Sequence, residues 1–143
     1  MFAMRMQFNE QIIKTESFEN LYINGKKQGF SFDIQLAYYR GHYLSDIDLL
    51  EVLIDGEKIP AEAVTFELKG KELSLYKLKY AVTEFWSQVE PAKLHVLKPG
   101  GLAGEHDIEL KLVLRIPYMQ IGPEHDFMPL DSGEKVSVSF EGE

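Results

Sequence analysis

Aromatic and basic side chains gather in one short stretch, and they are the first candidates for chemistry in this sequence. The segment YYRGHY holds Tyr38, Tyr39, Arg40, His42 and Tyr43 within six positions. Tyr and Arg are enriched at the energetic centres of protein interfaces. The segment therefore predicts either a surface that binds a partner or covers a ligand, or a tyrosine-rich corner of the fold in which Arg40 pairs with a neighbouring acid.

The histidines give no local sign of a metal centre. None of the four lies two or four residues from another, the spacing at which one strand or helix presents two ligands. We expect them to be rim histidines held by hydrogen bonds. A metal-dependent enzyme on a small barrel would need His42, Glu105 and His106 to meet in space. The remaining histidines are His95 and His125.

Other familiar catalytic motifs are missing from the sequence. Without cysteine, neither a disulfide framework nor a thiolate metal site can form. There is no Gly-x-Ser-x-Gly elbow, and GGLAG at 100–104 lacks the spacing of a phosphate-binding loop. The carboxylates form no recognisable acid–base pair. We therefore do not expect a stand-alone enzyme.

The overall charge argues against two classes of partner. Fifteen basic and twenty-three acidic residues leave a net charge of −8, which repels phosphate backbones and anionic lipid surfaces. The basic residues are interleaved with acids rather than collected in a patch. No apolar run reaches the length of a signal peptide or the ~18 residues of a membrane span. We expect a cytoplasmic protein that binds neither nucleic acid nor membranes.

The clearest strand pattern in the chain leads into the aromatic stretch. Large side chains alternate with smaller or polar ones over residues 30–38, which predicts a strand with one buried face. Arg40 falls on the buried parity, so the strand must stop, bulge or give the guanidinium a partner. Gly41 supplies the backbone freedom for a sharp exit. The large residues are Phe30, Phe32, Ile34, Leu36 and Tyr38.

Turn signals divide most of the remaining chain into short strands. Three of them, between alternating apolar runs, predict hairpins. Residues 45–54 also fit a capped helix, but the turn that follows favours a strand from about Leu49 to Ile54. Residues 75–86 keep helical spacing, so we expect one or two helical turns there and Trp86 as a core or edge aromatic. The hairpin signals are Asn24-Gly25, Asp55-Gly56 and Lys69-Gly70.

The longest strand is predicted in the second half of the chain. Residues 106–116 alternate regularly, and Pro117 is expected to end the strand. Residues 119–133 contain two glycines and two prolines with little periodicity, which predicts a long surface loop. A last strand follows over 136–140. In residues 1–17 only Ile12 and Ile13 stand out as anchors.

These elements predict an all-β fold in a single domain covering residues 1–143. Short strands, frequent hairpins and at most one short helix are typical of an antiparallel β-sandwich, either jelly-roll-like or barrel-like. A chain of 143 residues is long enough to bury a full core. No internal repeat or linker divides it.

Four stretches, in this order and in a chain this short, form a specific pattern. They are YYRGHYLSDID at 38–48, VLIDGEKIP at 52–60, LKPGGLAGEHDIEL at 97–110 and RIPYM at 115–119. Together they resemble the β subunit of bacterial C-glycoside deglycosidases. The resemblance thins between 71 and 92 and after Met119.

The resemblance implies a heteromeric complex of carbohydrate metabolism. In that family a small β-sandwich subunit pairs with a larger α subunit that resembles xylose isomerase, a TIM barrel holding a divalent metal (Mn²⁺ or Mg²⁺). The complex is a lyase that cleaves the C–C bond between a 3-oxo sugar and an aromatic aglycone. The metal ligands and acid–base residues would belong to the α subunit, so we expect no cofactor and no catalytic residue in this chain.

Residues on the matching motifs are expected to contact the partner or shape the substrate pocket, with no chemical step assigned. We expect the cluster at 38–42 and the loop at 100–106 to meet at one end of the sandwich. There they would pack on the mouth of the barrel and exclude water. The residues are Tyr38, Tyr39, Arg40, Gly41, His42, Gly100, Gly101, Leu102, Gly104, His106, Arg115 and Tyr118.

A function from another class stays open beside this one. A free-standing carbohydrate-binding sandwich would stack Tyr39, Tyr43 or Trp86 on sugar rings, although most aromatic residues fall on core positions. The sequence does not determine which C-glycoside is used, the stoichiometry of the complex, or whether the chain also forms homo-oligomers.

Overall fold

Antiparallel strands dominate the computed structural model, which describes residues 12–36, 41–87, 89–121 and 126–140. The strands are β1 (Glu19–Ile23), β2 (Lys26–Ile34), β3 (His42–Tyr43), β4 (Ile47–Ile54), β5 (Glu57–Lys58), β6 (Val64–Leu68), β7 (Lys71–Ser74), β8 (Phe85–Trp86), β9 (Ala92–Leu97), β10 (Gly104–Ile121), β11 (Asp126–Asp131) and β12 (Glu134–Phe140). Short 3-10 helices are η1 (Thr15–Ser17), η2 (Leu44–Asp46), η3 (Ala61–Ala63) and η4 (Leu75–Tyr80).

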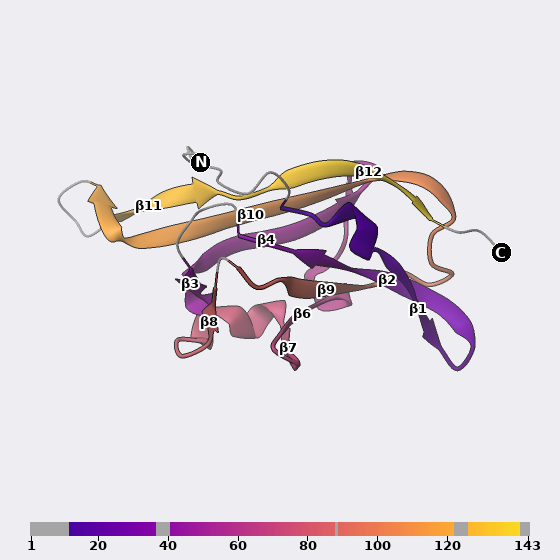
Figure 1. Ribbon diagram of the computed structural model, residues 1–143, viewed down its shortest axis with the longest axis horizontal. Helices are drawn as coiled ribbons and strands as arrows, with labels where there is room; N and C mark the ends of the chain where they lie inside the picture. Colours follow the sequence, from indigo (N-terminus) through magenta and orange to yellow (C-terminus); the bar gives the residue numbers. More distant parts are fainter. Residues whose placement is uncertain (1–11, 37–40, 88, 122–125, 141–143) are drawn as a thin grey trace.

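Two large sheets pack against each other across an apolar core (Figure 1). One has the order β1-β2-β9-β6-β7, and the other has the order β11-β10-β4-β5, with β12 also paired to β10. The pair β3-β8 forms a small third sheet. Neither large sheet closes on itself. The prediction of an all-β sandwich is confirmed, in its open rather than barrel-like form.

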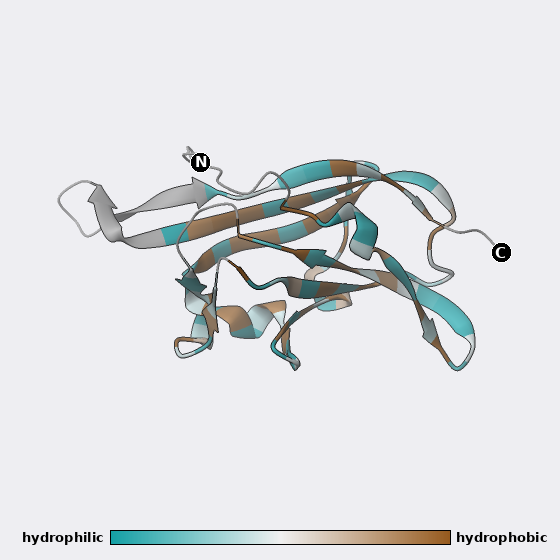
Figure 2. Ribbon diagram, in the orientation of Figure 1, coloured by the Kyte–Doolittle hydropathy of each residue, from teal (hydrophilic) through white to brown (hydrophobic). Residues whose placement is uncertain are grey.

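Alternation of apolar and polar residues builds this core. Hydrophobic and hydrophilic bands follow one another along β4 and β10 (Figure 2), because successive side chains of a strand point to opposite faces. Along β2, three large side chains and Leu36 beyond it are completely buried. Phe18 stacks on Phe32 with ring centroids 4.6 Å apart and meets Phe140 edge-on at 5.7 Å. The buried β2 side chains are Phe30, Phe32 and Ile34.

The three predicted hairpins are all present. They join β1 to β2, β4 to β5 and β6 to β7. Both residues of each turn have positive φ, as a type I′ turn requires. The angles are 53° and 79° at Asn24-Gly25, 51° and 84° at Asp55-Gly56, and 54° and 80° at Lys69-Gly70.

The first described residues are anchored to both sheets. Ile12 and Ile13 are fully buried, and Ile13 forms an isolated bridge with Ile34 on β2. Their amides donate to the Glu134 carboxylate of β12 at 3.0 and 2.7 Å. The expectation of anchors here is therefore confirmed, and the anchors tie the two sheets together.

The structure decides between strand and helix for the two segments with ambiguous patterns, residues 45–54 and 75–86. The segment before the second hairpin is strand β4, with only the 3-10 turn η2 ahead of it. In the second segment, residues 75–86, the helical spacing corresponds to η4, and Leu78 of that helix is buried. Trp86 is completely buried in the core, where its ring meets Phe66 edge-on at 5.5 Å. No helix among the described residues is long and apolar enough to cross a bilayer.

Two predictions about the second half are wrong. Pro117 does not end the long strand, since β10 continues to Ile121. The ladder with β11 shifts register between Ile116 and Gln120, and such an irregularity accommodates a residue without an amide proton. Much of the predicted loop at 119–133 is instead strand β11, which lies at the sheet edge, where Pro129 is tolerated.

Gly29 gives the sandwich a sharp test. A Cβ at this position would lie 2.0 Å from the carbonyl oxygen of Val96 on the neighbouring strand β9. Because backbone cannot move aside cheaply, we expect Gly29→Ala to lower the free energy of unfolding by about 2–3 kcal/mol. Urea unfolding measures this loss.

Gly25→Ala is the matched control, since nothing lies within 4 Å of its Cβ position. Only its positive φ opposes alanine there, so we expect a loss of about 1 kcal/mol. Equal losses in the two variants would show that the close approach of β2 and β9 is not tight.

Candidate functional site

A buried histidine lies at one end of the sandwich. His42 is in β3, pairs with Trp86 of β8 and has only 2% of its surface exposed. Neither ring nitrogen makes a hydrogen bond of good geometry to a described residue. The Asp46 carboxylate is the nearest acid, 3.9 Å from Nδ1. Burial lowers the pKa of His42 to about 4, and the backbone of Arg115 opposes this shift to a smaller extent. The imidazole is therefore neutral at pH 7.

Arg115 connects this end of β10 to the segment that follows His42. Its guanidinium donates to the carbonyl of Ser45 at 2.7 Å and lies 3.5 Å from the Asp48 carboxylate. Burial raises the pKa of the Asp46 carboxyl, and the positive charge of Arg115 acts against that rise. The arginine therefore holds η2 and the start of β4 against the long strand.

An apolar surface covers the same end, and we call it the aromatic end. It is formed by Tyr43, Phe85, Tyr80 and Val82. Tyr43 and Phe85 are 47% and 42% exposed, with ring centroids 5.1 Å apart in an edge-to-face arrangement. Tyr80 and Val82 are 72% and 63% exposed and flank Ala81, whose carbonyl accepts the amide of Ser45.

Close packing against β8 requires a glycine at position 41. A Cβ at Gly41 would lie 2.5 Å from the Phe85 ring and 2.6 Å from the carbonyl oxygen of Trp86. The indole of Trp86 donates to the carbonyl of Glu90 at 2.9 Å. Only glycine therefore lets the segment that enters β3 lie so close to β8.

The glycine-rich loop before β10 lies against the β1-β2 hairpin. The amides of Lys98 and Gly100 donate to the carbonyls of Gln28 and Lys27 at 2.8 and 3.1 Å. His106 bridges Asp55 and the carbonyl of Ala103, at 2.7 and 3.0 Å. Leu102 is buried in this region. The predicted site residues found here are Gly100, Gly101, Leu102, Gly104 and His106.

These two groups do not meet. Positions 106 and 115 of β10 lie roughly 30 Å apart at ~3.3 Å per residue, and His42 belongs to the Arg115 end. Figure 1 shows β3 and β8 at one end of the sandwich and the β1-β2 hairpin at the other. The prediction of one shared cluster is therefore wrong for the described residues. His42, Glu105 and His106 cannot hold one metal ion, so the alternative of a metal-dependent enzyme lacks the three ligands that it requires.

Some predicted site residues lie beyond what the structure describes. Tyr38, Tyr39 and Arg40 fall outside the described residues, and for Tyr118 the structure describes only the backbone, in β10. Their roles stay predictions. Of the predicted site residues that the structure describes, Gly41, His42 and Arg115 lie together at the end of the sandwich that holds β3 and β8.

Sequence reasoning missed the apolar part of the aromatic end. The sequence predicts one or two helical turns over residues 75–86 and does not single out Tyr80, Val82 or Phe85 as surface residues. A signal was present, since the segment carries more large residues than one buried helical face can use.

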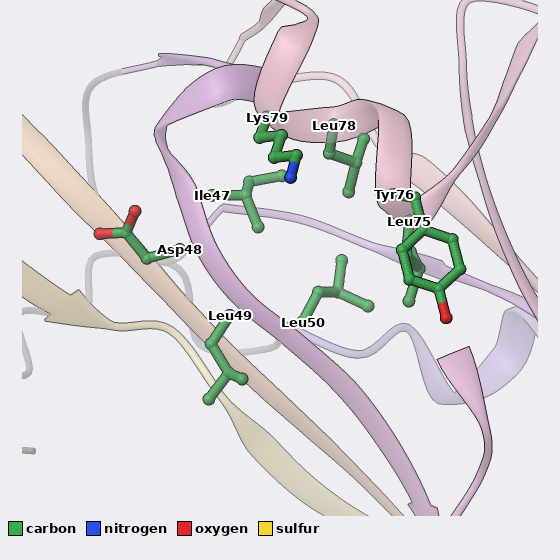
Figure 3. A pocket seen from close by; sticks show the side chains of 8 residues that line it. All are labelled: Ile47, Asp48, Leu49, Leu50, Leu75, Tyr76, Leu78 and Lys79. Carbon is green, nitrogen blue, oxygen red and sulfur yellow. The ribbon is translucent and has the colours of Figure 1, made fainter. Parts of the chain in front are cut away.

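Two pockets lie away from the predicted residues. One, of about 210 Å³, lies between η4 and the start of β4 and is lined by Leu50, Leu75 and Tyr76 among others (Figure 3). Ligand sites usually measure roughly 300–1,000 Å³. The other, of about 450 Å³, lies beside β10 where β11 gives way to β12. Neither is lined by a predicted site residue, so among the described residues the candidate site is a surface rather than either of these cavities.

Comparison with known protein families identifies the family of this chain. The sequence model described as "C-glycoside deglycosidase beta subunit" matches residues 8–118, which include both regions and most strands. The chain belongs to this family. The resemblance read from the four stretches is thereby confirmed, and the match ends close to Met119, where the resemblance thins.

Individual members of the family agree with this assignment. A C-glycoside deglycosidase beta subunit of Eubacterium cellulosolvens is 35% identical over 77% of this chain and 76% of its own length. One of Arthrobacter globiformis is 33% identical over 74% of this chain and 82% of its own. A 3'-dehydrocarminate deglycosidase beta subunit of a Microbacterium is 28% identical over 80% and 83%.

The two described histidines at opposite ends should give pH dependences of opposite sign. The pKa of His42 is about 4 in the fold against 6.5 ordinarily, so between these pH values the unfolded chain binds more protons. Its contribution, up to about 3 kcal/mol, is therefore present above pH 6.5 and lost as the pH falls toward 4. The hydrogen bond to Asp55 raises the pKa of His106, so its contribution is present below pH 6.5 and lost as the pH rises through the folded-state pKa.

Urea unfolding of the wild type, His42→Gln and His106→Gln from pH 5 to pH 8 measures both effects. We expect His42→Gln to flatten the acid side of the profile and His106→Gln to leave that side unchanged. Parallel acid-side profiles for the wild type and His42→Gln would contradict the buried neutral imidazole.

Proposed function

We propose that this chain is the non-catalytic β subunit of a cytoplasmic C-glycoside deglycosidase complex. In this proposal a larger α subunit, a TIM barrel with bound Mn²⁺ or Mg²⁺, carries the metal ligands and acid–base residues. The complex then acts as a lyase on the C–C bond of a 3-oxo-C-glycoside. Membership of the beta subunit family carries the proposal, because a β subunit by name functions with a partner.

The aromatic end is the surface that we assign to the α subunit. Half-exposed Tyr43 and Phe85 offer apolar area that docking would bury, and aromatic residues are enriched at interface hot spots. The motif residues Gly41, His42 and Arg115 lie beside them. The Tyr38–Arg40 stretch immediately precedes Gly41 in the sequence. Docking there would exclude water from the barrel mouth and help to shape the aglycone pocket.

The 100–106 motif, at the end of the sandwich that holds the β1-β2 hairpin, fits a structural role. A Cβ at Gly101 would lie 2.2 Å from the Lys27 side chain, and both ring nitrogens of His106 already have partners. Polar groups satisfied by their own chain gain little from a partner. We therefore assign the 100–106 motif to the packing of the loop against the β1-β2 hairpin.

Activity should require the partner. We expect the purified chain alone to release no aglycone from a 3-oxo-C-glucoside. Co-expressed with a xylose-isomerase-like barrel from the same gene neighbourhood, it should co-elute from a size-exclusion column and the complex should release aglycone. Turnover by the chain alone, or full activity of the barrel without it, would overturn the subunit proposal. Sugar affinity of the isolated chain would instead favour the carbohydrate-binding sandwich, although its candidate Trp86 is fully buried.

Tyr43→Ala tests the proposed docking surface. We expect the variant to weaken association with the α subunit by roughly tenfold or more, because a half-exposed aromatic at an interface centre loses its buried area. Tyr22→Ala is the matched control, since Tyr22 is 49% exposed, close to the 47% of Tyr43, but lies on β1. Surface plasmon resonance gives the affinities, and urea unfolding shows that both variants remain folded. Equal effects of the two substitutions would remove the aromatic end from the interface.

A further inference from the structure

Three potential metal ligands lie side by side on the outer face of the β1-β2-β9-β6-β7 sheet. His95 of β9 pairs with Thr65 of β6, and Glu67 of β6 pairs with Glu72 of β7. Residues two apart on a strand share a face, so the three side chains point to the same side. His95 Nε2 lies 2.7 Å from Glu67 Oε1. One ligand atom from each of the three side chains lies within 4.8 Å of the other two.

Lysine balances the charges on this face only in part, because Lys93 of β9 is directly opposite Glu67 but is also directly opposite Asp33 of β2. Glu67 and Glu72 are directly opposite each other, an arrangement that destabilises a sheet when both are ionised. Lys71 binds Glu84 at 2.6 Å, Lys69 lies 3.7 Å from Glu90, and Lys93 lies 3.9 Å from Asp33, so among the described residues no lysine forms an ion pair with Glu67 or Glu72. A bound cation would compensate the facing carboxylates.

We propose that Glu67, Glu72 and His95 form a binding site for a divalent transition-metal ion, with Zn²⁺ as the test ion. One imidazole nitrogen and two carboxylate oxygens are ligands that suit Zn²⁺ or Mn²⁺, whereas Ca²⁺ prefers six to eight oxygens. Metal–ligand distances of about 2.0–2.2 Å require the three atoms to draw together. The exposed side chain of Glu72 can make that adjustment by rotation.

The ion would act on the fold of this subunit. It would clamp β7, an edge strand, to β6 and β9, three neighbouring strands of one sheet. The site is separate from the metal that the proposed function places in the α subunit, and it does not depend on that proposal. Because the ion binds only the folded sheet, its binding raises the melting temperature.

The chain supplies its own control for this site. His106 also pairs with a carboxylate, Asp55, at the same 2.7 Å as His95 with Glu67. Its other ring nitrogen contacts the carbonyl of Ala103, and it is not part of a three-ligand group among the described residues. An exposed histidine–carboxylate pair alone should therefore not suffice.

Zinc titration of the tag-free full chain, stripped with EDTA and dialysed, tests the proposal. Calorimetry should show one equivalent of Zn²⁺, and the melting temperature should rise by several degrees at 100-fold excess over Kd. Glu72→Gln and His95→Gln should each weaken binding at least tenfold, while His106→Gln binds as the wild type does. Far-UV circular dichroism confirms that each variant folds.

Several outcomes would overturn the site. They are the absence of stoichiometric Zn²⁺ binding in the wild type, unchanged affinity in Glu72→Gln, and a loss in His106→Gln as large as that in His95→Gln. Tighter binding of Ca²⁺ than of Zn²⁺ would contradict the role of the imidazole. Because no partner subunit is used, failure here leaves the proposed function untouched.

Discussion

The ladder of β10 is the constraint on which the rest of the structure depends. One edge of this strand pairs with β4, and the other edge pairs first with β12 and then with β11. Antiparallel pairing aligns Ile54 with Ile108 and Ile47 with Leu114. The start of β4 therefore lies at the far end of β10. Everything attached to that start, including η2, β3 and the aromatic end, is carried away from the loop that precedes β10.

Local signals predicted most of the fold, because each was complete within a few residues. A turn such as Asp55-Gly56 needs only its own backbone freedom, and strand alternation needs only one buried face. Proline is the instructive exception. Pro117 and Pro129 indicate an end and a loop when read alone, yet both are acceptable where a ladder is irregular or a strand has an open edge. Whether a position meets those conditions depends on which strands pair, and that information is not local.

The sequence motifs do not reveal how the candidate site is assembled. The motifs at 38–48 and 97–110 lie within the region that matches the family, yet their separation follows from the antiparallel register of β4 and β10 rather than from either motif. His95 shows the same limit. Its ligand set with Glu67 and Glu72 is scattered through the sequence and is assembled only by the neighbouring positions of β9, β6 and β7. Spacing rules for metal sites detect ligands on one element and miss those spread across three.

The two ends of the sandwich differ in how their polar groups are satisfied, and this difference favours one of them as the docking surface. At the loop end, His106 has partners for both ring nitrogens, so a partner protein would have to break hydrogen bonds to engage it. At the aromatic end, Arg115 turns its guanidinium to Ser45 and Asp48, and Tyr43 and Phe85 are left at the surface. Burying those rings gains apolar area without desolvating an unpaired charge. The Ser45 carbonyl and the Asp48 carboxylate thus engage the Arg115 guanidinium within the chain, and the apolar surface of Tyr43 and Phe85 beside it suits the proposed α subunit.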